Sequence, residues 1–146
     1  MQIEFAHPSG MSGLKQVLLD CGLPGEDITP DHLDHFLILR DAERIAGVVG
    51  LEIFGKFALL RSLAIAPSKR NKGFATQLTK RAEAYARSKR VGTLYLLTLT
   101  AQGFFSKQGY QKTDRNLVPT VLQQTAEFKN LCPASAVCMV KSLEAI

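Results

Sequence analysis

The order of strand and helix signals predicts an α/β (α+β) fold. We expect a mixed, mostly antiparallel sheet with one parallel pair of strands and helices on both faces. Three strand-like segments follow one another through the short connections 41–44 and 55–56, and connections that short join antiparallel strands. The segment 59–98 then reads strand, helix, strand, and such a crossover joins parallel strands of one sheet.

The first half of the chain contains four expected strands and one expected helix. A short strand at 3–6 ends at His7-Pro8. Ser12 is the expected cap of a helix that ends near Gly22, because apolar residues recur at helical spacing at Leu14, Val17, Leu18 and Cys21. After a loop with one helical turn beyond Pro30, three strands are expected, at 36–40, 45–54 and 57–66.

The second half alternates between helices and strands. A helix begins at Gly73, and one of its faces is apolar, with Phe74, Ala75, Leu78, Ala82, Tyr85 and Ala86. The remaining expected elements are a strand at 94–98, a helix at 101–108, a helix at 118–122 and a last strand at 136–143.

Length and composition predict one globular domain over residues 1–146, with 46% hydrophobic and 21% charged residues. The net charge of +5 suits an anionic ligand and is too small to require nucleic acid, so nucleic-acid binding is not expected. Three cysteines without a CxxC pair predict neither a disulfide framework nor a structural zinc site. No signal peptide or membrane span is recognised, so a cytoplasmic location is expected.

A basic turn joins the strand 57–66 to the helix that follows it. Residues 70–75, with the sequence RNKGFA, fit the pattern R-x-x-G-x-A. Gly73 lets the backbone approach a ligand closely, and the free N–H groups of a helix start bind phosphate. The pattern alone also fits a solvated basic turn. It lacks the further glycines of a dinucleotide site and the GK[ST] ending of a Walker loop.

The sequence around this turn is more specific. Residues 63–86, LAIAPSKRNKGFATQLTKRAEAYA, resemble the cofactor-binding motif of the GNAT superfamily of N-acetyltransferases. Residues 101–110, AQGFFSKQGY, resemble the A-x-x-F-Y-x-x-x-G-F segment of that family. The expected element order agrees over nearly the whole chain. The resemblance implies an enzyme that transfers an acetyl group from acetyl-CoA directly to an amine, without a metal.

The resemblance also implies where the cofactor binds. The backbone of Leu63, Ala64 and Ile65 would pair with the pantetheine arm, and the acetyl group would lie near Leu63 and Leu97 between two splayed strands. The pyrophosphate would bind to the backbone of seven consecutive residues: Arg70, Asn71, Lys72, Gly73, Phe74, Ala75 and Thr76. Phe105 is expected beside the cofactor.

Two positions depart from the family pattern. Thr98 stands where many members carry Asn, and Phe105 stands where many carry the Tyr that protonates the departing thiolate. Phenylalanine cannot donate a proton. The acid is therefore another group such as Tyr110 or Tyr95, a water molecule, or none, because a thiolate is a tolerable leaving group.

A narrower resemblance concerns the acceptor. LLRSLAIAP, YLLTLTAQGFFSKQGY and the tail EFKNLCPASAVCMVKSL resemble short bacterial N-acetylglutamate-synthase-like proteins and their relatives in arsenic-resistance operons. Arg61 and Ser62 lie on the strand that borders the acceptor side, and Thr98 is expected near the acceptor. A buried Arg needs a partner. It either clamps an acceptor carboxylate or forms an internal ion pair with Glu52.

Glu52 is the candidate base, because it interrupts an apolar strand beside Arg61. Tyr110 is the second candidate catalytic residue. His35 is an alternative base, and Cys132-Pro133 is a candidate for the pocket wall rather than a nucleophile.

The leading hypothesis is an acetyl-CoA-dependent N-acetyltransferase for a small amino-acid-like amine, either glutamate-like or a toxic analogue. A non-catalytic acyl-CoA-binding module and a protein N-acetyltransferase are the alternatives. A homodimer is a further expectation, because dimers are common in the family that the chain resembles.

Overall fold

The computed structural model describes residues 1–144, and these form two compact units. The first comprises residues 1–52 and 60–85, and the second comprises 53–59 and 86–144. A seven-stranded, mostly antiparallel sheet has the strand order β1-β2-β3-β4-β5-β7-β6. Its one parallel pair is β4–β5, as the strand–helix–strand crossover predicts.

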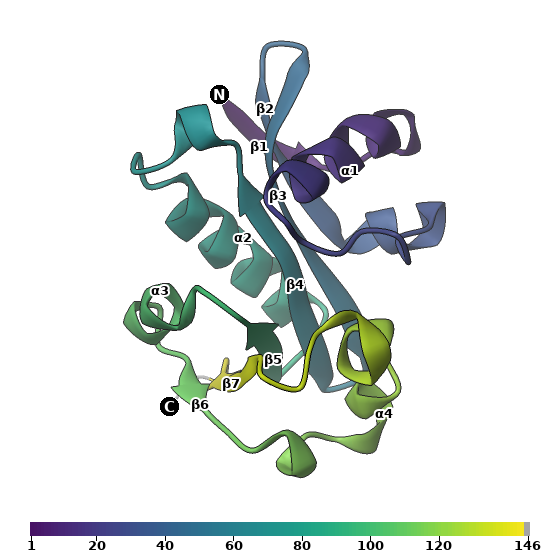
Figure 1. Ribbon diagram of the computed structural model, residues 1–146, viewed down its shortest axis with the longest axis vertical. Helices are drawn as coiled ribbons and strands as arrows, with labels where there is room; N and C mark the ends of the chain where they lie inside the picture. Colours follow the sequence, from purple (N-terminus) through teal and green to yellow (C-terminus); the bar gives the residue numbers. More distant parts are fainter. Residues whose placement is uncertain (145–146) are drawn as a thin grey trace. The chain divides into compact units, whose positions relative to one another are not determined.

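The elements follow one another along the chain as Figure 1 shows. The strands are β1 (Gln2–Phe5), β2 (Phe36–Asp41), β3 (Arg44–Phe54), β4 (Phe57–Ile65), β5 (Thr93–Thr98), β6 (Gln111–Lys112) and β7 (Val137–Ser142). The α-helices are α1 (Met11–Asp20), α2 (Phe74–Ser88), α3 (Gln102–Lys107) and α4 (Thr120–Gln123). The shorter turns are η1 (Pro8–Gly10), η2 (Pro30–His35), η3 (Pro67–Lys69), η4 (Arg115–Leu117) and the π-helical η5 (Glu127–Leu131).

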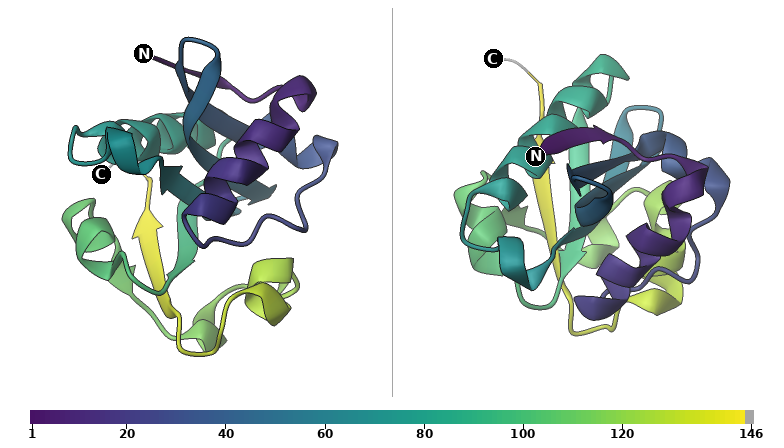
Figure 2. Two further views of the ribbon diagram at one scale, coloured as in Figure 1. Left: turned by 45° about the horizontal axis from the view of Figure 1, so that its top comes forward. Right: turned by 90° about the horizontal axis from the view of Figure 1, so that it is seen from above.

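In the first unit, helices cover both faces of the sheet. Successive side chains of a strand point to opposite faces, and residues 36–39 of β2 are all buried. Helix α1 packs against one face, where its Leu14, Val17 and Leu18 join Phe36, Ile38, Val48 and Ala64 in one core. Helix α2 lies across the other face, as the views in Figure 2 show.

The second unit is built around β5. Residues 57–59 of β4 pair with residues 93–95 in parallel, and β7 pairs with the whole of β5 in antiparallel register. The two-residue strand β6 pairs with β7. A small core of Leu59, Val118, Leu122 and Cys138 holds α4 against this part of the sheet.

Most expected elements are present, with ends shifted by one or two residues. The expected Ser12 cap is wrong: α1 begins at Met11, because the 3-10 turn η1 leads directly into it, and the cap residue Gly10 makes no side-chain bond. The sequence gives no local signal for β6, whose two exposed residues become a strand only by pairing with β7. It also gives none for η5.

Candidate functional site

The basic turn after β4 forms an open backbone cradle in the first unit. Asn71 and Gly73 have φ of 63° and 85°, and this left-handed geometry turns the chain into α2. A Cβ added at Gly73 would meet no atom within 4 Å, so the space beside it is open. The first helical hydrogen bond runs from the N–H of Gln77 to the carbonyl of Gly73 over 3.1 Å. The N–H groups of residues 74–76 come before that bond and point out of the N-terminal end of α2.

Side chains fix the shape of this turn. Arg70 Nε donates to the Ile65 carbonyl over 3.0 Å, and Arg70 Nη2 donates to Cys21 Sγ over 3.4 Å. Lys69 forms an ion pair with Asp41 over 3.0 Å. Two cations of the turn, Lys69 and Arg70, are therefore anchored to neighbouring residues, and the third, Lys72, is exposed. Backbone N–H groups and the positive end of the helix dipole at the start of α2 are groups of the kind that bind phosphate.

Strand β4 leads to the cradle and contains an irregular residue. Ser62 is buried and has φ of 62°, in the left-handed region that a non-glycine residue rarely adopts. This residue interrupts the regular alternation of the strand just before Leu63, Ala64 and Ile65, the expected pantetheine-binding segment. The sequence carries no signal for such a conformation at a serine.

A cluster of buried charges surrounds Arg61, whose side chain has no exposed surface. Arg61 Nη1 and Nη2 donate to the two oxygens of Asp27 over 2.6 and 2.8 Å, which is bidentate geometry. Nη1 also donates to Glu52 Oε2 over 2.9 Å. Nε donates to the Ser62 hydroxyl over 3.0 Å. The internal pair with Glu52 that was one of the two alternatives for Arg61 is present.

Asp27 is a partner of Arg61 that the sequence did not predict. It lies on the loop between α1 and η2, 34 residues before Arg61, so neither spacing nor periodicity links the two. Burial raises the pKa of the Asp27 carboxyl, but the hydrogen bonds and positive charge of Arg61 outweigh burial and lower it below 3.8. Asp27 is therefore ionised at neutral pH.

His32 completes this cluster. Its Nδ1 accepts a hydrogen bond from the backbone N–H of Thr29 over 3.0 Å, in a capping box at the start of η2. One atom each of Asp27, His32 and Glu52 lies within 4.8 Å of the others. Such a group could hold a metal ion, but the guanidinium of Arg61 already binds both carboxylates and opposes a second cation. We call these four residues, Asp27, His32, Glu52 and Arg61, the Arg61 cluster.

The other candidate residues lie in the second unit. The Thr98 hydroxyl accepts a hydrogen bond from the Ala101 N–H over 2.9 Å, so it helps to start α3. The Phe105 and Tyr110 rings pack edge to face with centroids 5.5 Å apart. Tyr110 is only 2% exposed, and the Lys141 ammonium lies 5.4 Å from its ring centre.

The alternative residues have structural partners. His35 Nδ1 and the Tyr85 hydroxyl are hydrogen-bonded over 2.7 Å. Cys132 Sγ lies 3.8 Å from Glu127 Oε1. The three cysteines are all free, and burial raises the pKa of Cys138 to about 11, so that this thiol stays protonated at neutral pH. No helix among residues 1–144 is long and apolar enough to cross a membrane.

Comparison with known proteins identifies the family. Residues 32–112 match the model of the acetyltransferase (GNAT) domain, which covers more than half of the chain, so the chain belongs to that family. It is an acyltransferase that uses acetyl-CoA to acetylate an amine. An uncharacterized N-acetyltransferase of Chlorobaculum tepidum is 29% identical over 118 residues, which cover 77% of this chain and 74% of the relative.

Solved structures share the fold. The N-acetylglutamate synthase of Neisseria gonorrhoeae, complexed with coenzyme A and N-acetyl-glutamate, superposes with a TM-score of 0.85 at 18% identity. That match covers 99% of this chain but 35% of the synthase chain. An aminoglycoside 6′-N-acetyltransferase complexed with coenzyme A gives a TM-score of 0.73 at 16% identity and covers 100% of this chain and 99% of its own.

Proposed function

We propose that this acetyltransferase acetylates the primary amine of a small amino-acid-like acceptor. Glutamate-like compounds are the first candidates, together with toxic analogues such as phosphinic or arsenical glutamate mimics. The observation that carries the proposal is the Arg61 cluster, which gathers two carboxylates and one guanidinium beside β4. Charged groups held at such a place recognise a small charged molecule rather than an apolar one.

In this proposal the cofactor binds along β4 and the turn after it. The backbone of Leu63, Ala64 and Ile65 pairs with the pantetheine arm, and the cradle at 70–76 binds the pyrophosphate. Phe105 packs against the cofactor. The open space beside Gly73 and the N–H groups at the start of α2 support the phosphate assignment.

The charges of the Arg61 cluster favour one way of binding the acceptor. One guanidinium and two carboxylates together carry a net charge of −1, which suits the ammonium group of the acceptor. Asp27 already accepts hydrogen bonds from both terminal nitrogens of Arg61. An acceptor carboxylate can therefore bind Arg61 and Ser62 only if it displaces Asp27. Thr98 is a further candidate contact for the acceptor.

The reaction needs a base, and Glu52 is the proposed one. It takes the proton from the ammonium group, directly or through water, and Arg61 holds its carboxylate in position. The amine nitrogen then attacks the thioester carbon, the carbon–sulfur bond breaks and the CoA thiolate leaves. Tyr110 is the proposed proton donor to that thiolate.

The proposal is tested by release of CoA thiol from acetyl-CoA with a panel of acceptors. We expect turnover with glutamate or its phosphinic or arsenical analogues, and no turnover with lysine-containing peptides. If every amino-acid-like acceptor fails while CoA still binds, the acceptor assignment is wrong. Turnover confined to peptides would instead favour a protein N-acetyltransferase.

Two matched pairs of variants test the catalytic residues. Glu52→Gln should lower kcat about 100-fold with CoA affinity unchanged, whereas Asp31→Asn, on the exposed surface of the same unit, should have no effect. Tyr110→Phe should lower kcat about 10-fold, whereas Tyr95→Phe should not. Equal kcat in Tyr110→Phe and the wild type would mean that water, and not Tyr110, donates the proton to the CoA thiolate.

A further inference from the structure

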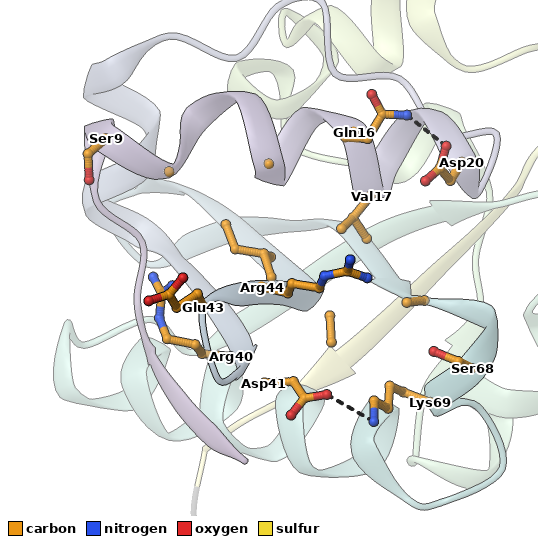
Figure 3. Close-up of a pocket in the computed structure, with 15 residues that line it drawn as sticks. Ser9, Gln16, Val17, Asp20, Arg40, Asp41, Glu43, Arg44, Ser68 and Lys69 are labelled. Carbon is orange, nitrogen blue, oxygen red and sulfur yellow. Dashed lines mark hydrogen bonds and ion pairs between the residues drawn. The ribbon is translucent and has the colours of Figure 1, made fainter.

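A pocket with a volume of about 660 Å³ lies in the first unit (Figure 3). Three segments form its walls: α1 with the turn before it, the β2–β3 hairpin, and the end of β4 with η3. The pocket shares no lining residue with the Arg61 cluster. Its volume is in the range of small-molecule sites, which is roughly 300 to 1,000 Å³.

The floor of this pocket is apolar and is kept open by small residues. Ile45 lies beneath α1, and an added Cβ would approach its Cδ1 to 3.3 Å from Gly10 and to 3.4 Å from Gly13. The two glycines thus let the start of α1 lie close to the hairpin without side chains that fill the space. Ala46 and Ala66 are also small and lie in the pocket wall.

The rim of the pocket contains equal numbers of basic and acidic residues. Its three basic residues are Arg40, Arg44 and Lys69, and its three acidic residues are Asp20, Asp41 and Glu43. Arg40 is bound by Glu4, and Lys69 is bound by Asp41, whose pKa it holds below the usual range. Both of these cations are therefore already engaged by protein carboxylates.

Arg44 is the cation that remains available. Its side chain makes no hydrogen bond or ion pair with any residue in 1–144, and it is exposed. Figure 3 shows its guanidinium lying across the pocket, between α1 and η3. A guanidinium binds a carboxylate with two parallel hydrogen bonds. Glu43, which is exposed on the same hairpin, likewise has no side-chain partner among these residues.

We propose that this pocket is a second binding site, for a free α-amino acid or a zwitterion of that kind. Arg44 binds the carboxylate of the ligand, and the acidic rim binds its ammonium group. A ligand with a single charge would leave either the basic or the acidic residues of the rim without an opposite charge. Acetylation turns the ammonium into a neutral amide, so the site distinguishes a free amino acid from its N-acetyl derivative.

The proposal rests on the pocket and not on the acceptor proposed above, and the test separates the two. The full chain, labelled with ¹⁵N, is titrated with L-glutamine, L-arginine and L-alanine, and with the N-acetyl form of each. We expect saturable shifts of the amide signals of Gly10, Gly13 and Arg44 with the free amino acids, and at least 10-fold weaker binding of the N-acetyl forms.

Variants locate the binding. Arg44→Glu should weaken binding at least 10-fold, while Arg81→Glu, the same charge change on the exposed surface of α2, should leave it unchanged. Glu52→Gln should also leave it unchanged, because Glu52 belongs to the Arg61 cluster. All three variants are checked for CoA binding, so that a misfolded protein is recognised.

Three results would overturn the second site. The first is the absence of saturable shifts up to about 20 mM amino acid. The second is binding that Glu52→Gln removes and Arg44→Glu preserves, which would place the ligand in the Arg61 cluster. The third is equal binding of the free and N-acetyl forms. None of these results changes the outcome of the CoA-release assay.

Discussion

The Arg61 side chain is fully buried, and the free-energy cost of burying its charge is offset only while carboxylates lie beside it. Its two terminal nitrogens each donate a hydrogen bond to Asp27, and one of them also donates to Glu52. A buried charge that loses its partner destabilises the fold far more than the pair stabilised it. Asp27 thus joins the loop after α1 to β4, and it also sets the charge beside the proposed base.

Removing the Asp27 carboxylate should destabilise the folded protein. We expect Asp27→Ala to lower the free energy of unfolding by about 3 kcal/mol, measured by urea denaturation, because the buried Arg61 loses both of its hydrogen bonds to Asp27. Asp31→Ala removes an exposed carboxylate from the same unit and should change it by less than about 0.5 kcal/mol. Similar values for the two variants would show that the buried pair contributes little.

The same residue should shape stability at acid pH. The pKa of Asp27 is lower in the folded state than its ordinary value of 3.8, so its contribution is complete above that value and is lost as pH falls through the lowered one. As pH falls below about 4, the free energy of unfolding should decrease more steeply in the wild type than in Asp27→Asn. Parallel curves would contradict the lowered pKa.

At the scale of the element, the strand–turn–helix unit of β4, η3 and α2 is the proposed cofactor site. The left-handed residue Gly73 and the first N–H groups of α2 belong to this one local unit. Motif and geometry therefore coincide, and a backbone site of this kind depends on conformation more than on side-chain identity.

Gly73→Glu should abolish this site. The change puts a side chain and a negative charge into the open space beside the turn, and we expect CoA to bind at least 100-fold more weakly by isothermal titration. Gly55→Glu is the matched control. Gly55 also has a positive φ, of 63°, and open space around it, but it lies in the β3–β4 turn. Equal losses in both variants would point to backbone strain rather than to the cradle.

At the scale of the whole molecule, charge is the property to test. Eighteen basic and thirteen acidic residues give +5, and CoA carries several negative charges on its phosphates. The dissociation constant of CoA should rise about 5-fold between about 50 and 500 mM NaCl, because salt screens this attraction. Pantetheine, which has no phosphate, should show no such dependence, and an equal response of both ligands would contradict the electrostatic explanation.

The fold was predictable because its signals are local. Turn residues at 41–44 and 55–56, the apolar face of α2 and the R-x-x-G-x-A turn each act over a few residues. Strand β6 was not predictable, since its two exposed residues have no apolar pattern and pair only because β7 lies beside them. The left-handed Ser62 was not predictable either, because serine has no preference for that conformation.

The sequence by itself determined the family, the order of the elements and the place of the turn proposed to bind phosphate, all of which follow from local patterns. It also identified Arg61 and Glu52 as charges that need partners. Only the tertiary structure decided which partners they have, and it placed Asp27 in the fork of Arg61 from 34 residues away. The physical reason is that a buried charge must be neutralised by whatever the fold brings near it, and that neighbour is set by packing rather than by sequence distance.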